Sequence, residues 1–174
     1  MADVYAVFGT LLALGIAFPG LLAGSWLLFP GPIARARVRI AATPVRSFFF
    51  GLAAVVLTAI PVALLNALPL GITKLAGTLI IFGAFGVATL GAAAVADEMG
   101  DRLREQGPPS LSRAGAFLRG AVALELAASF PIVGWFLVIP GVLLAGYGAG
   151  VFALLRWLPG PRLAPRVDAL PIQA

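Results

Sequence analysis

The chain has 174 residues, of which 61% are hydrophobic and only 11% are charged, with a net charge of +5. Soluble domains carry about 25% charged residues, and a chain of this size could not hide so much apolar surface in one core. These proportions exclude an ordinary soluble domain and predict that most of the chain lies in a lipid bilayer. The sequence contains no cysteine and no histidine, which excludes disulfides, thiolate or imidazole metal sites and haem held by imidazole.

Charged residues divide the chain into long neutral stretches, and a spanning helix needs about 20 apolar residues. We expect spanning helices at about 4–29, 48–68, 75–96 and 135–157. The third should continue past the membrane to Glu105, with Glu98 and Arg102 spaced for an ion pair. A fifth segment, 112–130, contains Arg119 and Glu125 and is only marginally apolar. We expect it to insert as a hairpin with the last helix, turning at 131–134 and capped by a serine at 110 or 112.

The positions of the basic residues indicate how many times the chain crosses the membrane. With five spans and an outer N-terminus, the eleven arginines lie on the cytoplasmic side and Lys74 alone lies outside, as the positive-inside rule requires. A four-span arrangement would put Arg162 and Arg166 outside. We therefore predict one transmembrane helical domain over 1–158 and a proline-rich cytoplasmic tail over 159–174.

The first cytoplasmic connection, 30–47, has an alternating pattern. Arg35, Arg37 and Arg39 alternate with apolar residues, and a period of two is typical of an extended segment. With Arg46, such a ribbon would present guanidinium groups to lipid phosphates or to an acidic partner. The alternative is a solvated signal that only sets the orientation in the membrane.

Small residues mark candidate packing faces of the helices. Gly20 and Gly24, and also Gly146 and Gly150, have the GxxxG spacing that lets helix backbones approach closely in lipid. They would pack helices within the chain or, alternatively, form a face for a partner. Prolines fall inside three expected spans, where they should kink or break the helix, at positions 19, 61 and 140.

Polar groups inside the expected spans are few, and the main ones are Asn66, Arg119 and Glu125. Glu125 could carry a proton or bind a cation, or it could be a structural anchor bonded to Asn66 or Lys74. None of these residues is accompanied by the other groups that an active site needs, namely a nucleophile, a base and an oxyanion site. We expect no catalytic activity, no cofactor, no nucleic-acid partner and no metal, although a carboxylate metal cluster within 97–105 is a weaker alternative.

Four short segments carry a resemblance. They are Trp26-Leu-Leu-Phe-Pro30, Pro44-Val-Arg-Ser-Phe-Phe-Phe-Gly51, Phe130-Pro-Ile-Val-Gly-Trp135 and the glycine-rich stretch 146–150. Over most of residues 22–157 the pattern resembles a bacterial multi-pass membrane domain that is often fused behind a bactofilin-like, polymer-forming β-helical domain. The resemblance implies a membrane anchor for an assembly, with no catalytic residues. No β-helical segment is read here, so it also implies a cargo bound in trans.

Taken together, these features predict an all-α bundle of about five transmembrane helices in a bacterial inner membrane. The N-terminus would lie outside and the C-terminus in the cytoplasm. The expected role is a non-catalytic anchor, scaffold or accessory subunit that contacts membrane lipids and other membrane proteins within a larger complex. The alternative is a small transporter or channel that uses Glu125 and Asn66.

Overall fold

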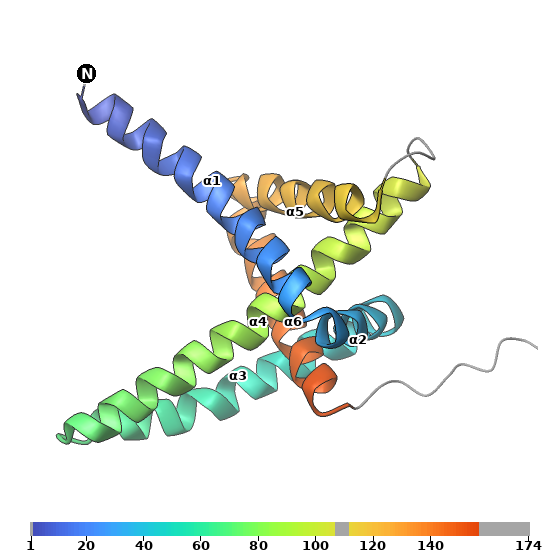
Figure 1. Cartoon of the computed structure of the whole chain (residues 1–174). Coiled ribbons are helices and arrows are strands. Elements are labelled where there is room, and N and C mark those ends of the chain that lie inside the picture. The colour runs from blue at the N-terminus through green and yellow to red at the C-terminus, as the bar shows by residue number, and fades with distance from the viewer. Residues whose placement is uncertain (1, 107–111, 157–174) are drawn as a thin grey trace, which may run out of the picture.

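The computed structural model describes residues 2–106 and 112–156 and is helical throughout this part of the chain (Figure 1). The elements are α1 (Ala2–Leu28), α2 (Pro30–Ala42), α3 (Pro44–Ala67), α4 (Gly71–Glu105), α5 (Arg113–Ser129), the π-helix η1 (Gly134–Val138) and α6 (Ile139–Leu154). The prediction of an all-α fold is confirmed for these residues. The expected tail at 159–174 lies outside the described residues.

Prolines determine where most of the helices separate. Four residues that end or separate helices each precede a proline, and all four have left the α-helical region of backbone space: Phe29 (φ −126°, ψ 53°), Thr43 (φ −147°, ψ 65°), Leu68 (φ −75°, ψ 139°) and Phe130 (φ −66°, ψ 122°). A proline ring disfavours the helical conformation of the residue before it. The break at Phe29 is the sharpest consequence, because α2 leaves the end of α1 at an angle of 108°.

Two prolines expected to kink or break their helices do not end them. α1 continues through Pro19 and α3 continues through Pro61. Pro140 lies at the start of α6, directly after the π-helix η1. A proline lacks the N–H group that a helix interior needs, and here the helical hydrogen-bond pattern changes from π to α directly before it.

The connection 30–47 is helical, which makes the prediction of an extended ribbon wrong. α2 covers Pro30–Ala42, and α3 begins directly afterwards at Pro44. Alternation of arginine with alanine or valine also fits a helix, because each step of two residues turns the helix by about 200°. Arg35 and Arg39 therefore share one face of α2, and Arg37 lies on nearly the opposite face.

Among the described residues, three helices are long and apolar enough to cross a membrane: Pro44–Ala67, Gly71–Glu105 and Gly134–Leu154. The bent pair Gly15–Leu28 and Pro30–Ala42 raises the number to as many as four. α4 has 35 residues, or about 52 Å, whereas a hydrocarbon core is about 30 Å thick. Its charged end therefore lies beyond the apolar crossing, as the predicted extension to Glu105 requires.

Figure 1 shows how the helices are arranged around the middle of α4. α3 runs beside the first half of α4 as a long two-helix arm, while α5 packs against the second half and α6 crosses between them. The core at this crossing consists mainly of small side chains, including Ala92, Ala93, Ala96, Ala121 and Ala149. Small side chains allow close approach of helices in lipid, where apolar burial alone gives little association.

Glycines lie at the closest of these helix crossings. A methyl group on Gly91 of α4 would collide with the backbone of Gly146 of α6. A methyl group on Gly120 of α5 would collide with the backbone of Ala96 and Gly100 of α4. Any larger residue at these positions would push the helices apart.

The glycines of α6 serve two neighbouring helices because they alternate around its axis. Gly146 and Gly150 face the backbone of α4, at Ala88, Gly91 and Val87, as their GxxxG spacing predicts. Gly148, between them, faces Ser47 of α3. In α1, by contrast, a methyl group on Gly20 or Gly24 would meet nothing within 4 Å in the described part of the chain, so these two do not pack the helix within the chain.

Candidate functional site

The main polar site is formed by one arginine of α2 and three carboxylates at the end of α4. The guanidinium of Arg37 binds Asp97 through Nη1 at 3.3 Å, Glu98 through Nε at 3.1 Å, and Asp101 through Nη2. Asp97, Glu98 and Asp101 share one face of α4 because residues separated by three or four positions are neighbours on a helix. We call Arg37 and these three carboxylates the Arg37 cluster.

Two further elements contact the cluster through its most buried member. The side chain of Asp97 is only 3% exposed, and it accepts a hydrogen bond of 3.2 Å from Nε1 of Trp26 in α1. Arg113, at the start of α5, lies 3.9 Å from the same carboxylate. The ring of Trp26 stacks on Phe117 of α5 with centroids 5.0 Å apart. The cluster therefore joins α1, α2, α4 and α5.

Exposed arginines complete the charge balance of the cluster. Arg102 binds Glu98 at 3.0 Å, which confirms the predicted ion pair, and Arg104 lies 3.5 Å from Asp101. Every carboxylate of the cluster thus faces two guanidinium groups. The predicted helix cap is also confirmed, since the Ser112 side chain accepts a hydrogen bond from the backbone N–H of Gly115.

These contacts shift the pKa values of two members. Burial alone would raise the pKa of Glu98, but hydrogen bonds from Arg37 and Arg102 outweigh it, so that the pKa lies below its ordinary value. Burial opposes the charged form of Arg37 as well, yet its hydrogen bond to Glu98 and the charges of Asp101 and Asp97 raise its pKa. Both groups therefore stay charged across the neutral range.

The other two arginines of α2 face the end of α6. Nε of Arg35 donates a hydrogen bond of 2.9 Å to the backbone carbonyl of Ala153. The guanidinium of Arg39 lies 4.0 Å above the ring of Phe152, in a cation–π contact. A cation near the C-terminus of a helix also interacts favourably with the helix dipole. Arg46, in the first turn of α3, is exposed.

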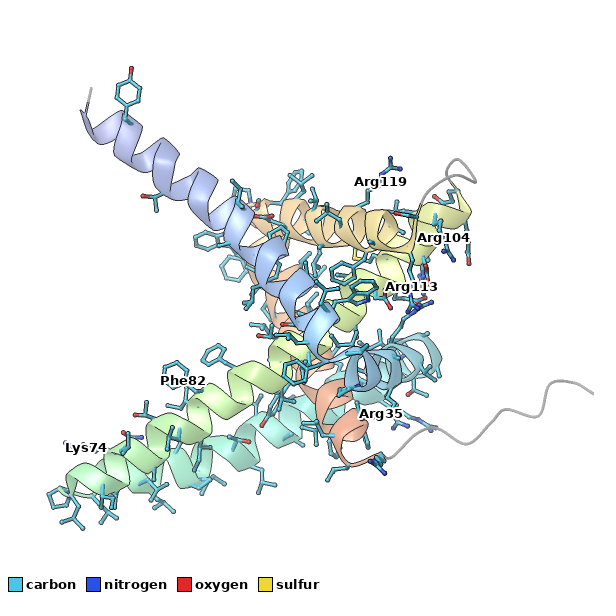
Figure 2. All side chains as sticks on the ribbon, in the orientation of Figure 1. Arg35, Lys74, Phe82, Arg104, Arg113 and Arg119 are labelled. Carbon is cyan, nitrogen blue, oxygen red and sulfur yellow. The ribbon has the colours of Figure 1, made fainter. Side chains whose placement is uncertain are left out.

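The three intramembrane polar residues singled out from the sequence are not brought together. Asn66 donates to the carbonyl of Val62 in its own helix. Figure 2 shows Lys74 at the tip of the α3–α4 arm and Arg119 pointing away from α5. In the described part of the chain the side chain of Glu125 has no hydrogen bond or ion pair, so the suggested bond to Asn66 or Lys74 is absent there.

Glu125 lies instead on a crevice between α1, α4, α5 and the start of α6. The crevice has a volume of about 510 Å³ and is open on one side. Its walls are mostly apolar and include Phe18, Ala92, Val138 and Val142. Gly15 of α1 lies beside the carboxylate, because a methyl group there would lie 3.3 Å from Oε1.

Comparison with models of protein families, with curated proteins and with solved structures gave no match for this chain. Within the described residues there is also no group of three histidine, cysteine or carboxylate side chains arranged to hold a metal ion. The carboxylates of the Arg37 cluster are balanced by Arg37 together with Arg102, Arg104 and Arg113.

Sequence reasoning missed three participants in the cluster, namely Trp26, Asp97 and Arg113. One signal was present: Asp97, Glu98 and Asp101 fall on one helical face, and an acidic face on an apolar helix needs cations. The sequence does not predict which cations these are, because their position depends on the bend after α1 that brings α2 back to α4.

Proposed function

We propose that this chain is a non-catalytic integral membrane protein that acts as an anchor, scaffold or accessory subunit of a larger membrane assembly. The observation that carries the proposal is the Arg37 cluster. In it, one arginine binds three carboxylates, and the contacts around them join four helices. Groups paired in this way stabilise an arrangement of helices and leave no free acid or base for chemistry.

The surface of the helices supports a membrane location for such a scaffold. Large apolar side chains are exposed along the α3–α4 arm, for example Leu57, Leu64, Ile72 and Phe82. Monomeric soluble proteins rarely expose a continuous apolar surface of this extent. Lipid or the helices of a partner would cover it.

We further propose five spans, with α5 as the fourth crossing and the N-terminus outside. α5 has 17 residues and carries Arg119 and Glu125, so it depends on its neighbours for insertion. The positions of charges support the orientation, because Lys74 lies at one end of the molecule and Arg35, Arg104 and Arg113 lie toward the other (Figure 2). The setting we propose is a bacterial inner membrane, in line with the resemblance described above.

In this arrangement α2 rests on the cytoplasmic surface of the bilayer. Its arginines turn toward α4 and α6, while its exposed residues are apolar or small, namely Pro30, Gly31, Ala34, Val38 and Ala41. An apolar outer face suits contact with acyl chains at the interface. Arg46 is exposed beside this face and would bind a lipid phosphate.

Co-purification tests the proposed role most directly. The tagged chain is solubilised in mild detergent from its native membrane, and its partners are quantified against the tagged variant Gly24→Leu. Gly24 has open space beside it, so this change leaves the fold intact and blocks a partner helix that uses the GxxxG face of α1. We expect partners at fixed stoichiometry with the wild type and fewer with the variant. Isolation of the wild type as a lone monomer would overturn the proposal.

A second function, a small transporter or channel, is favoured by one observation, the crevice that contains Glu125. A buried ionisable group in lipid commonly marks a transport path. Flux of protons or cations into vesicles that contain the purified chain separates the two functions. A transporter loses flux in Glu125→Gln, whereas an anchor shows no flux above that of empty vesicles in either form.

A further inference from the structure

The crevice beside Glu125 has the size and composition of a ligand site. Its volume of about 510 Å³ falls within the range of about 300–1,000 Å³ that is usual for small-molecule pockets. Such pockets have mostly apolar walls and a few polar groups that orient the ligand. Here the walls come from α1, α4, α5 and the helix that η1 and α6 form together, which supplies Trp135 and Ile139.

The hydroxyl groups of this crevice are already bonded, whereas its one carboxylate is not. The Thr89 hydroxyl donates to the carbonyl of Phe85, and the Ser129 hydroxyl donates to the backbone carbonyl of Glu125. The carboxylate of Glu125 has no hydrogen bond or ion pair in the described part of the chain. It is therefore the group available to a ligand.

The cations of the described residues lie elsewhere. Arg119 is six residues earlier on α5, about 240° around the helix, and points away from the bundle (Figure 2). Lys74 is at the far tip of the α3–α4 arm. The arginines of the Arg37 cluster are bound to the end of α4. An anionic group in apolar surroundings gains most from an opposite charge within about 4–6 Å, and none of the described residues supplies that charge.

We propose that the crevice binds one single-chain lipophilic amine, with its ammonium group against the carboxylate of Glu125 and its alkyl chain along Phe18, Val138 and Val142. A phospholipid with an ethanolamine headgroup carries an ammonium too, but its phosphate would lie in the crevice without a cation from the described residues. A fatty alcohol would fill the same space without neutralising the carboxylate. The inference is independent of whether the chain serves as an anchor.

The fluorescence of Trp135 provides a direct measurement, because this residue lines the crevice. The chain has three tryptophans, and the variant Trp26→Phe with Trp157→Phe leaves Trp135 alone. This protein in a non-ionic detergent is titrated with 12-bromododecylamine, with 12-bromododecanol and with a bromine-labelled phosphatidylethanolamine, since bromine quenches nearby tryptophan. We expect the amine to reach half-maximal quenching at a concentration at least tenfold lower than either other probe.

Three variants in the same background identify the group responsible. Glu125→Gln keeps the shape of the side chain and should remove the tenfold preference for the amine. Glu105→Gln, at the exposed end of α4, should retain it. Gly15→Leu keeps the carboxylate but fills the space next to it, and should weaken quenching by the amine.

Two results would overturn the proposal. The first is a preference for the amine that survives Glu125→Gln, or no preference over the alcohol in the wild type. The second is stronger quenching by the phospholipid than by the amine, which would assign the crevice to a lipid headgroup. Failure of the co-purification experiment would not produce either result, because the quenching is measured on the purified chain alone.

Discussion

Two regions of this protein place carboxylates in opposite surroundings. At the end of α4, Asp97, Glu98 and Asp101 all bind Arg37. On α5, Glu125 lines an apolar crevice and has no ion pair in the described part of the chain. In the first region the charges form ion pairs that join helices, whereas in the second the charge of Glu125 joins no helices in the described part of the chain.

This contrast distinguishes charged groups that hold the fold together from a charged group that is free to bind a ligand. Removing Arg37 leaves each of the three carboxylates with one exposed arginine and the buried Asp97 with its weaker ion pair, at 3.9 Å, and the helices that the cluster joins should loosen. Removing the charge of Glu125 leaves no partner behind, and it should affect a bound ligand more than the fold. The two regions should therefore respond to equivalent substitutions in different ways.

The largest effect is expected for Arg37→Ala. The carboxylate of Asp97 is 3% exposed, and removal of one partner of a buried ion pair typically costs about 3–5 kcal/mol. We expect a loss of this order in the free energy of unfolding, measured in detergent by thermal or denaturant titration.

The matched control for that experiment is Arg119→Ala, at an exposed arginine that points away from α5. Substitutions of this kind usually change stability by no more than about 0.5 kcal/mol. Equal losses in the two variants would mean that the Arg37 cluster does not hold the helices together.

A smaller effect is expected at the helix crossing between the two regions. Gly91→Ala places a methyl group against the backbone of Gly146, and overpacking of this kind costs about 1–3 kcal/mol. Gly83→Ala, earlier in α4, meets nothing within 4 Å and should be neutral or slightly stabilising, since alanine favours a helix over glycine by about 1 kcal/mol. Unfolding in detergent compares the two, and a loss at position 83 as large as that at 91 would contradict the observed crossing.

The pH dependence of stability sharpens the comparison further. The pKa of Glu98 is lowered in the folded protein from its ordinary value of 4.5, so its ionised form stabilises the fold above that value. This contribution is lost as the pH falls below 4.5 and passes through the lowered pKa. Wild type and Glu98→Gln should therefore differ in stability at pH 7 and converge in acid. A difference that widens as the pH falls would contradict the ion pairs at Glu98.

The smallest effect on stability is expected for Glu125→Gln. The amide has the same shape and costs less to hold in apolar surroundings than an unpaired carboxylate. We expect no loss, and at most a gain of about 1 kcal/mol, in the same unfolding measurement. A loss comparable to that of Arg37→Ala would show that Glu125 is a structural anchor after all.

The sequence predicted the helices well because their signals are local. Apolar stretches, the charged extension of α4 to Glu105 and the cap at Ser112 were all readable from neighbouring residues. The connection 30–47 was misread because arginine at every second position fits both an extended strand and a helix. Its helical form divides Arg37 from Arg35 and Arg39 and sends them to different partners.

The candidate sites were less predictable because they depend on contacts between distant segments. Arg37 is about 60 residues from its carboxylates, and the two meet because α2 leaves α1 at 108°. Glu125 was singled out as an ionisable residue in a span, but its apolar crevice is formed by four elements whose packing no local pattern encodes.

The central claim is that the chain crosses the membrane five times with its arginines on one side, and labelling of single cysteines tests it most directly. The native chain has no cysteine, so Leu70→Cys, Gln106→Cys and Ile132→Cys each give one unique site in sealed vesicles of known orientation. Positions 70 and 132 follow α3 and α5, and position 106 follows α4. Five spans require 70 and 132 to react from the outer side and 106 from the cytoplasmic side. Reaction of 132 together with 106 would mean that α5 does not cross, and the five-span arrangement would be wrong.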